Sequence, residues 1–194
     1  MIGESTRLSR IVRKGRIMLL AMDQGMEHGP SDFNAKNINP DYVLDIAAKG
    51  GFSALAIGKG VAYKYLEPYA GQVPLVLKLN GRTSIVPKDS VYSAPNATVE
   101  EAVKLGADAI GYTLYVGSPH EAKMFHEFGM IHAKAKEYGM PTVVWAYPRG
   151  MYVKNEKDPA IIAYAARAAA ELGADIVKVN YPGSIDGLRQ VVAA

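Results

Sequence analysis

A single lysine stands among apolar residues in segment 175–183, which reads DIVKVNYPG. If this segment is a strand, side-chain alternation places Ile176, Lys178 and Asn180 on one face and two valines on the other. The valine face suits packing against helices, so we expect Lys178 to point into the interior. Burial lowers the pKa of a lysine, and the free amine can then attack a carbonyl group. The alternative is a lysine at a strand end whose ammonium group reaches water.

The segment PTVVWAYPRG at 141–150 carries a second group of candidates. Alternation puts Trp145 and Tyr147 on one face, and Pro148 ends the strand. If this strand lies beside the one that holds Lys178, the phenol of Tyr147 lies near the amine, where a cationic imine would lower its pKa and let it relay protons. Arg149 follows and suits an anionic substrate, because its planar fork matches phosphate oxygens. An ordinary core aromatic pair and a solvated arginine would give the same pattern.

Two further candidates lie in LLAMDQGMEHGP at 19–30. Asp23 shares a face with Leu19 and Ala21, and it ends an apolar strand. Its carboxylate could cap a loop or assist imine formation. His28 follows in a glycine-rich loop, where it could contact a phosphate or simply bond to the backbone.

Lys78 occupies an inward position in LVLKLNG at 75–81, on the same face as Val76 and Asn80. It could be a second imine-forming lysine, a phosphate ligand or a salt-bridge partner inside the fold. The first role is the least favoured, because no aromatic acid lies beside it in the sequence.

Several classes of protein are excluded by composition. The chain has 194 residues, 49% of them hydrophobic and 21% charged, as in ordinary soluble proteins. A net charge of +3 is too small and too evenly spread to indicate a nucleic-acid partner. The absence of cysteine excludes disulfides, thiolate metal sites and a cysteine nucleophile. No apolar run approaches the ~20 residues of a membrane span, so we expect a cytoplasmic protein without a membrane partner.

The histidines do not predict a metal site. His120, His126 and His132 are six residues apart on an expected helix, so successive side chains are rotated by about 240° and cannot form one ligand face. Glu27 with His28 supplies too few ligands alone. Basic residues near the N-terminus could suit a transit peptide, but their spacing favours a short amphipathic helix.

A repeated pattern predicts the elements that carry these residues. LGAD occurs at 105–108 and 172–175, each time after a helical pattern and before an apolar run, and AAKGGFSALAI at 47–57 is a looser copy. Helix, glycine, short loop and strand in repetition indicate βα units and a parallel sheet. We expect strands at 17–23, 52–57, 73–79, 108–113, 141–147 and 175–180. We expect helices at 5–13, 40–49, 61–69, 98–105, 119–138, 158–172 and 184–194.

The distribution of polar residues favours a TIM (β/α)8 barrel over an open doubly wound sheet. Neither MDQGMEHGP nor GKGVAY matches the glycine fingerprint of dinucleotide-binding folds. Polar residues instead end several strands, as on the active-site face of a barrel. The chain contains about six βα units where a barrel needs eight. We therefore expect residues 1–194 to form a single barrel domain that lacks its last two units.

Five separated motifs occur in an order that resembles the archaeal-type class I fructose-1,6-bisphosphate aldolases: LAMDQGMEHGP, LVLKLNG, VEEAVKLGADAIGYTLYVGS, VVWAYPRG and LGADIVKVNYPG. The resemblance extends from about residue 5 to residue 184. It implies that Lys178 forms the imine, that Tyr147 transfers protons and that Asp23 is the catalytic aspartate of the first strand. Trp145 and Arg149 match positions at the substrate site, and His28 and Lys78 also match motif positions.

The resemblance further implies a reaction. Fructose 1,6-bisphosphate would be cleaved reversibly to dihydroxyacetone phosphate and glyceraldehyde 3-phosphate, with no metal and no organic cofactor. The expected partners are a phosphorylated sugar and further copies of the chain, since barrel aldolases of this kind usually form rings. The family's phosphate site is built by its seventh and eighth strands, so we expect the chain alone to be poorly stable and weakly active. A related transaldolase-like synthase of amino-deoxy sugar precursors and a non-catalytic sugar-phosphate-binding fragment are the alternatives.

Overall fold

A six-stranded parallel sheet runs through the middle of the molecule, and the computed structural model describes all residues, 1–194. Its strands follow chain order, and every neighbouring pair is parallel. They are β1 (Leu19–Met22), β2 (Ala54–Gly58), β3 (Leu75–Lys78), β6 (Ala109–Val116), β7 (Thr142–Pro148) and β8 (Ile176–Lys178). An order without reversal is that of a barrel, since a doubly wound sheet changes direction at its switch point.

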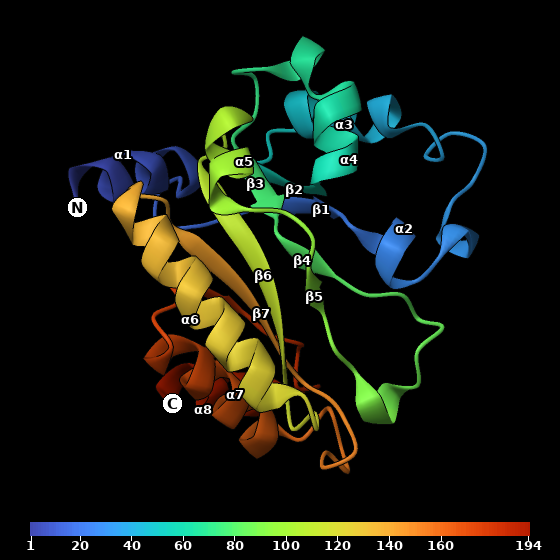
Figure 1. The fold of residues 1–194 in the computed structure, drawn as a ribbon, viewed down its shortest axis with the longest axis vertical. Coiled ribbons are helices and arrows are strands. Elements are labelled where there is room, and N and C mark those ends of the chain that lie inside the picture. The colour runs from blue at the N-terminus through green and yellow to red at the C-terminus, as the bar shows by residue number, and fades with distance from the viewer.

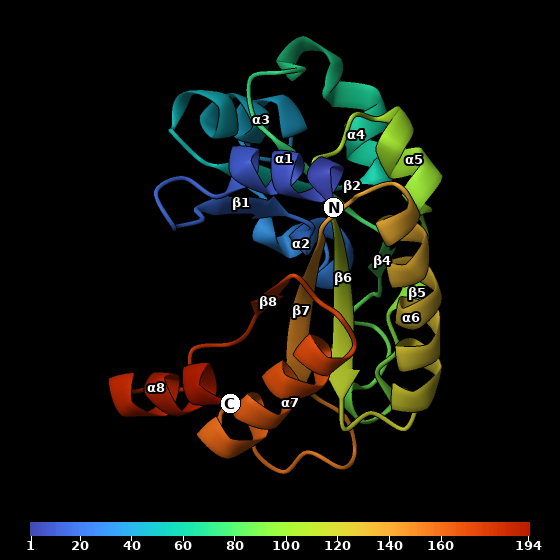
Figure 2. The same cartoon turned by 90° about the vertical axis from the view of Figure 1, so that its left-hand side faces the viewer.

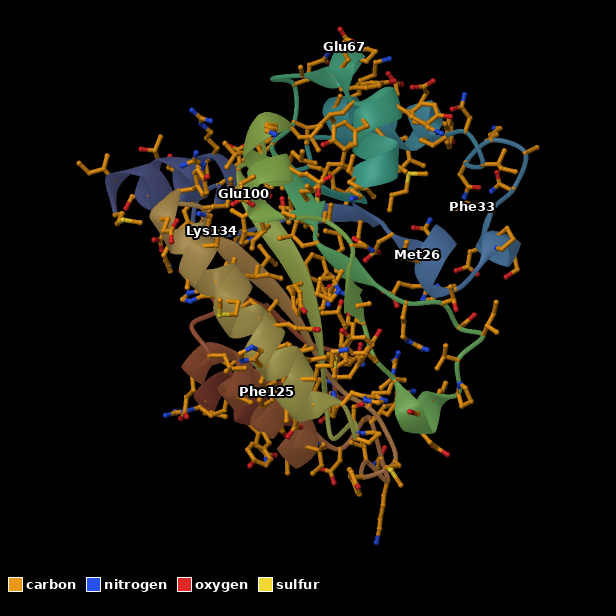
Figure 3. The ribbon with its side chains drawn as sticks, in the orientation of Figure 1. Met26, Phe33, Glu67, Glu100, Phe125 and Lys134 are labelled. Atoms are coloured by element: carbon orange, nitrogen blue, oxygen red, sulfur yellow. The ribbon has the colours of Figure 1, made fainter.

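The sheet curls into part of a barrel, with helices along its outer side. Figure 2 shows the strands turning progressively from β1 and β2 to β6 and β7. The covering helices are α3 (Pro40–Lys49), α4 (Lys59–Tyr65), α5 (Val99–Lys104), α6 (Glu121–Glu137) and α7 (Pro159–Glu171), and α8 (Ile185–Ala193) packs against α7. An ion pair of 3.6 Å between Glu100 and Lys134, both labelled in Figure 3, joins α5 to α6. The predicted partial barrel with six βα units is therefore confirmed.

Local sequence explains where these helices begin. The side chains of Asn39 and Asp158 accept hydrogen bonds from the first turns of α3 and α7, and proline follows each of them. Thr98 and Glu101 form a reciprocal capping box at α5. The predicted helix 61–69 is wrong in its second half. It ends as α4 at Tyr65 and continues as the 3₁₀ turn η2 (Glu67–Tyr69), in which Pro68 cannot donate a helical hydrogen bond.

Short elements that the sequence patterns did not predict lie at the strand ends. A two-residue antiparallel pair joins β4 (Asn80–Gly81) to β5 (Ala94–Pro95). The helix α2 (Gln24–Glu27) follows β1 directly, and η1 (Pro30–Asp32) and η3 (Lys88–Ser90) are single 3₁₀ turns. Figure 1 shows α2 and the loops around β4 and β5 on the same side of the sheet. Together these elements build one wall of the site described below.

The two faces of the sheet bury different side chains. Large residues such as Leu55, Leu77 and Ile110 face the helices. The inner face holds smaller residues, with the exception of Trp145, and the separate interior cluster comprises Ile11, Ala54, Ala56, Val76, Ala109, Val143 and Trp145. Small inner side chains allow the strands to curve around a narrow interior. The alternation of side chains between the inner and outer faces then continues along each strand to its carboxyl end.

The helix α1 (Ile2–Ile11) covers the interior at the amino ends of the strands, and Figure 2 shows it beside the start of the sheet. Ile11 is fully buried in the interior cluster. The guanidinium of Arg10 lies 3.0 Å from Asp108, just before β6, and Lys136 on α6 lies 2.8 Å from both Glu4 and Asp175. The predicted amphipathic helix at the N-terminus thus packs against the amino ends of the strands and shields the interior from solvent there. The helix α1 thus covers the interior at the amino ends of the strands, whereas no comparable helix covers it at their carboxyl ends.

No helix in the structure combines the length and the apolar character that crossing a membrane would need.

We expect Ile11→Ala to lower the free energy of unfolding by about 2–5 kcal/mol, because the lost side chain leaves a cavity at the base of the interior. Urea unfolding followed by far-UV circular dichroism would measure the change. Ile2→Ala is the matched control, since Ile2 is on the same helix but is 89% exposed. Equal effects of the two substitutions would show that α1 does not seal the interior.

Candidate active site

Six of the predicted site residues line one cavity of about 290 Å³ at the carboxyl ends of the strands: Asp23, His28, Trp145, Tyr147, Arg149 and Lys178. They come from the ends of β1, β7 and β8 and from the segments that follow. The alternation that puts Ala21, Val143 and Ile176 inside also puts Asp23, Tyr147 and Lys178 there. The predicted convergence of these side chains therefore occurs in the structure.

Lys178 lies directly against Tyr147. The two strands are neighbours, with Trp145 opposite Lys178 in the register. The amine of Lys178 donates a hydrogen bond to the phenol oxygen of Tyr147. Its Nζ atom is 5.1 Å from the centroid of the Tyr147 ring and 5.9 Å from that of Trp145. A primary amine and a phenol thus lie in direct contact at this point of the cavity.

The surroundings of Lys178 favour its neutral amine. Burial of the amine lowers the pKa of Lys178, and the positive charge of Lys78 lowers it further, whereas Asp23 opposes the shift. Residue 178 as a whole is exposed, because β8 pairs only with β7. The amine is therefore in a partly apolar site yet open to a ligand, as an imine-forming lysine needs to be.

Tyr147 is held as a neutral phenol. Burial raises the pKa of Tyr147, and the negative charge of Asp23 raises it further. The expected lowering by a cationic imine does not apply to the free chain, in which no imine is present. A phenol that keeps its proton at neutral pH can act as a proton donor, and its oxygen accepts the hydrogen bond of the Lys178 amine, which holds the two groups together.

Arginine residues surround a second part of the cavity. The guanidinium carbons of Arg82 and Arg149 each lie 5.5 Å from the centroid of the Tyr115 ring. Arg149 is 3.4 Å from Glu156, and its Nε atom makes no hydrogen bond. His28 is at the rim, largely exposed, with its Nδ1 atom 2.6 Å from Asp32. Two guanidinium groups and an imidazole can bind an anion a short distance from Lys178.

Three lining residues were missed by the sequence patterns: Glu27, Arg82 and Tyr115. Tyr115 lies on the inner face of β6, so the alternation from Ala109 could have identified it. Burial raises the pKa of Tyr115 to about 12, and the charge of Glu27 adds to the shift. Glu27 and Arg82 follow β1 and β4 in short or irregular segments, where no periodic pattern predicts the direction of a side chain.

Lys78 lies deeper than the other predicted residues, and it lines a neighbouring cavity of about 570 Å³. Its ammonium group donates a hydrogen bond of 3.1 Å to the carbonyl oxygen of Asn80 and is 3.6 Å from Asp23. Among its three predicted alternatives, this geometry is that of an interior salt-bridge partner. Met26 and Phe33, labelled in Figure 3, belong to the wall of the same neighbouring cavity.

Comparison with known proteins finds close relatives. Residues 17–194 match the DeoC/LacD family of aldolases. The chain is 50% identical over 173 residues to the class 1 fructose-bisphosphate aldolase of Thermoproteus tenax, which covers 88% of this chain and 64% of that relative. It is 38% identical over 181 residues to the fructose-bisphosphate aldolase/6-deoxy-5-ketofructose 1-phosphate synthase of Methanocaldococcus jannaschii, covering 88% of this chain and 58% of that protein. The chain thus spans less than two thirds of either relative.

Solved structures agree with the sequence comparison. An archaeal fructose-1,6-bisphosphate aldolase with its catalytic lysine covalently bound to the carbinolamine intermediate of the substrate superposes with a TM-score of 0.91. It is 44% identical in sequence, and the match covers 98% of this chain and 75% of that one.

Gly111 leaves the space that the ring of Trp145 and the stem of Lys78 occupy. A Cβ atom at this position would lie 2.7 Å from the indole and 3.2 Å from Cδ of Lys78. We expect Gly111→Ala to displace the indole and to cost about 1–3 kcal/mol of stability through overpacking. Trp145 is the only tryptophan of the chain, so its fluorescence emission reports the displacement directly.

Gly129→Ala is the control for this substitution, because Gly129 is exposed on α6 and its added Cβ would meet no atom within 4 Å. Unchanged emission in Gly111→Ala would contradict the crowding argument.

Proposed function

The chain belongs to the DeoC/LacD family of aldolases, and on that basis we propose that it cleaves fructose 1,6-bisphosphate reversibly through an imine on Lys178. The observation that carries the proposal is the contact between the amine of Lys178 and the phenol of Tyr147 inside one cavity. The fructose-bisphosphate aldolases among its relatives supply the substrate class.

The residues support a stepwise mechanism. The neutral amine of Lys178 attacks the C2 carbonyl of the open-chain sugar, and loss of water gives a protonated imine. The C3–C4 bond then breaks as the C4 hydroxyl loses its proton to water. The electron pair moves into the imine to form an enamine, and glyceraldehyde 3-phosphate leaves. Tyr147 donates its proton to C3 of the enamine and regains a proton from water. Hydrolysis of the resulting imine releases dihydroxyacetone phosphate and restores the amine.

The other predicted residues have supporting roles in this proposal. Asp23 assists imine formation with its carboxylate, since it lines the same cavity as Lys178. Arg149 and His28 contact a phosphate of the substrate, and Trp145 forms the apolar wall beside the amine. The guanidinium groups of Arg82 and Arg149 in the same cavity favour an anionic ligand. The imine serves as the electron sink, so the proposed steps need no metal or organic cofactor.

A second candidate function is favoured by one of the relatives. The protein of Methanocaldococcus jannaschii carries two names, one of which is a 6-deoxy-5-ketofructose 1-phosphate synthase. Such a transaldolase-like exchange would use the same lysine. Turnover of a panel of phosphorylated ketoses and aldehydes would separate the two reactions. A non-catalytic sugar-phosphate-binding role is the remaining alternative, and in that case Lys178→Ala would leave function intact.

The domain organisation, the assembly and the cellular location of the chain remain predictions. Residues 1–194 are proposed to be one barrel domain that is incomplete at its carboxyl end, to assemble with further copies of the chain, and to work in the cytoplasm. Size-exclusion chromatography with light scattering would test the assembly.

We expect borohydride to trap an adduct on Lys178 when dihydroxyacetone phosphate is added, and intact mass followed by peptide mapping would detect it. Trapping should increase with pH through the lowered pKa of Lys178, because only the neutral amine attacks the carbonyl. Lys178→Met should abolish the adduct, whereas Lys154→Met, at an exposed lysine outside the cavity, should leave it unchanged. A folded wild-type chain without an adduct would refute the proposed function.

Tyr147→Phe separates imine formation from proton transfer. We expect the variant still to give the borohydride adduct, because the nucleophilic amine of Lys178 is unchanged. Exchange of the C3 proton of dihydroxyacetone phosphate with deuterated solvent should slow by about 10²–10⁴-fold, the usual contribution of a positioned acid or base. NMR of the ketone would follow the exchange. Wild-type exchange rates in this variant would exclude Tyr147 as the proton donor.

A further inference from the structure

Lys78 is a charged residue for which the proposed steps have no use. Only 3% of its side chain is exposed, far less than for any other site lysine. Its Nζ atom is 3.6 Å from Oδ2 of Asp23 and 3.9 Å from Oε1 of Glu27. A hydrogen bond of 3.1 Å to the carbonyl oxygen of Asn80 completes its surroundings. One hydrogen-bond acceptor and two carboxylates at ion-pair distance therefore surround the ammonium group from within the protein.

The stem of Lys78 is held as firmly as its ammonium group. It passes over Gly111, where even a methyl group would lie only 3.2 Å from Cδ. The indole of Trp145 covers its other side, with the ring centroid 5.3 Å from Nζ. Lys78 does not line the cavity that holds Lys178. Its position is that of an internal counter-ion, not of a ligand for the substrate.

Asp23 and Glu27 need such a counter-ion. They are four residues apart across the short helix α2, so their carboxylates lie on one face and repel each other. Glu27 accepts a hydrogen bond of 3.2 Å from the hydroxyl of Tyr115, and its Oε2 atom is 4.0 Å from Arg82. Its Oε1 atom, buried and without a hydrogen bond, is the one that faces Lys78. Removing the ammonium group would leave Asp23 without its ion-pair partner and Glu27 with Arg82 alone.

Lys178 shares this electrostatic environment. Both amines lie near the indole of Trp145, whose ring centroid is 5.3 Å from Nζ of Lys78 and 5.9 Å from Nζ of Lys178. The charge of Asp23 favours the protonated, unreactive form of Lys178, and the charge of Lys78 disfavours it. Lys78 lowers the pKa of Lys178 in two ways, since its charge repels a proton on Lys178 and also offsets the charge of Asp23.

We propose that Lys78 is a positioning residue whose buried ammonium group holds Asp23 and Glu27 in place and keeps Lys178 in its nucleophilic form. This inference rests on the proposed imine chemistry of Lys178. Burial lowers the pKa of Lys78 itself, but Asp23 and Glu27 oppose that shift and favour its charged form. The other charged or titratable groups that face the two amines come from every neighbouring element: Arg82, Tyr115, Tyr147, Arg149 and, at the rim, His28.

Competitive labelling with acetic anhydride tests the inference without any substrate. The reagent acylates neutral amines, and peptide mass spectrometry of samples labelled across a pH series gives the titration midpoint of Lys178. We expect Lys78→Met to raise that midpoint by about one pH unit, the order of shift that a neighbouring charge produces. Lys78→Arg keeps the charge and should keep the midpoint close to that of the wild type.

Lys59→Met is the matched control, because Lys59 pairs with Glu101 at 3.2 Å on the far side of the neighbouring cavity. It should leave the midpoint of Lys178 unchanged. An unchanged midpoint in folded Lys78→Met, or a rise of equal size in Lys59→Met, would overturn the inference.

Glu27→Gln gives a test of opposite sign that does not depend on the folding of Lys78→Met. Removing one negative charge while Lys78 remains should lower the midpoint of Lys178, whereas loosened packing would move it toward the value of a solvated lysine. A rise or no change in Glu27→Gln would contradict the proposed charge balance. The borohydride experiment on the wild-type chain tests imine formation separately, so failure of that chemistry is distinguishable from failure of the role of Lys78.

Discussion

The alternation of side chains along curved parallel strands is the constraint on which the structure depends. On the inner face it places small residues such as Ala54, Ala56 and Ala109, which leave room for the sheet to curl. The same alternation, carried to the carboxyl ends of the strands, delivers Asp23, Tyr147 and Lys178 to one cavity. A shift of one residue in register would turn these side chains toward the helices and bring leucines into the interior. Packing of the core and assembly of the site are therefore consequences of one pattern.

The interior is closed at the amino ends of the strands and open at their carboxyl ends. This difference decides where a substrate can reach reactive side chains. At the amino ends of the strands, Ile11 and the ion pairs of Arg10 and Lys136 seal the interior with α1. At the carboxyl ends no helix closes it, and short segments such as α2 supply charged groups instead. Stability is concentrated at one end and reactive side chains at the other, as is general in barrel enzymes.

Two lysines on the inner face illustrate how position determines role. Lys78 and Lys178 both contact the indole of Trp145, yet their amines have different partners. Lys78 is enclosed by Asp23, Glu27 and the backbone of Asn80, which occupy its ammonium group. Lys178 has one hydrogen-bond partner, Tyr147, and opens to the cavity. An amine that is desolvated but not fully paired is the more reactive one, because burial disfavours its charge without filling its lone-pair direction.

Much of the fold and part of the site could be predicted from the sequence alone. The repeated helix–glycine–strand pattern determined the six βα units, and the period of two determined that Lys178 and Tyr147 point inward, because both signals are local and depend on few neighbouring residues. Only the tertiary structure decided that Lys78 lies between Asp23 and Glu27 and that Arg82 and Tyr115 belong to the site. These contacts join β1, α2, β4 and β6, and their distances depend on sheet curvature and on irregular segments that have no period. The split of helix 61–69 at Pro68 was likewise decided by the path of the chain after α4, where a 3₁₀ turn replaces the helical hydrogen bond that proline cannot donate.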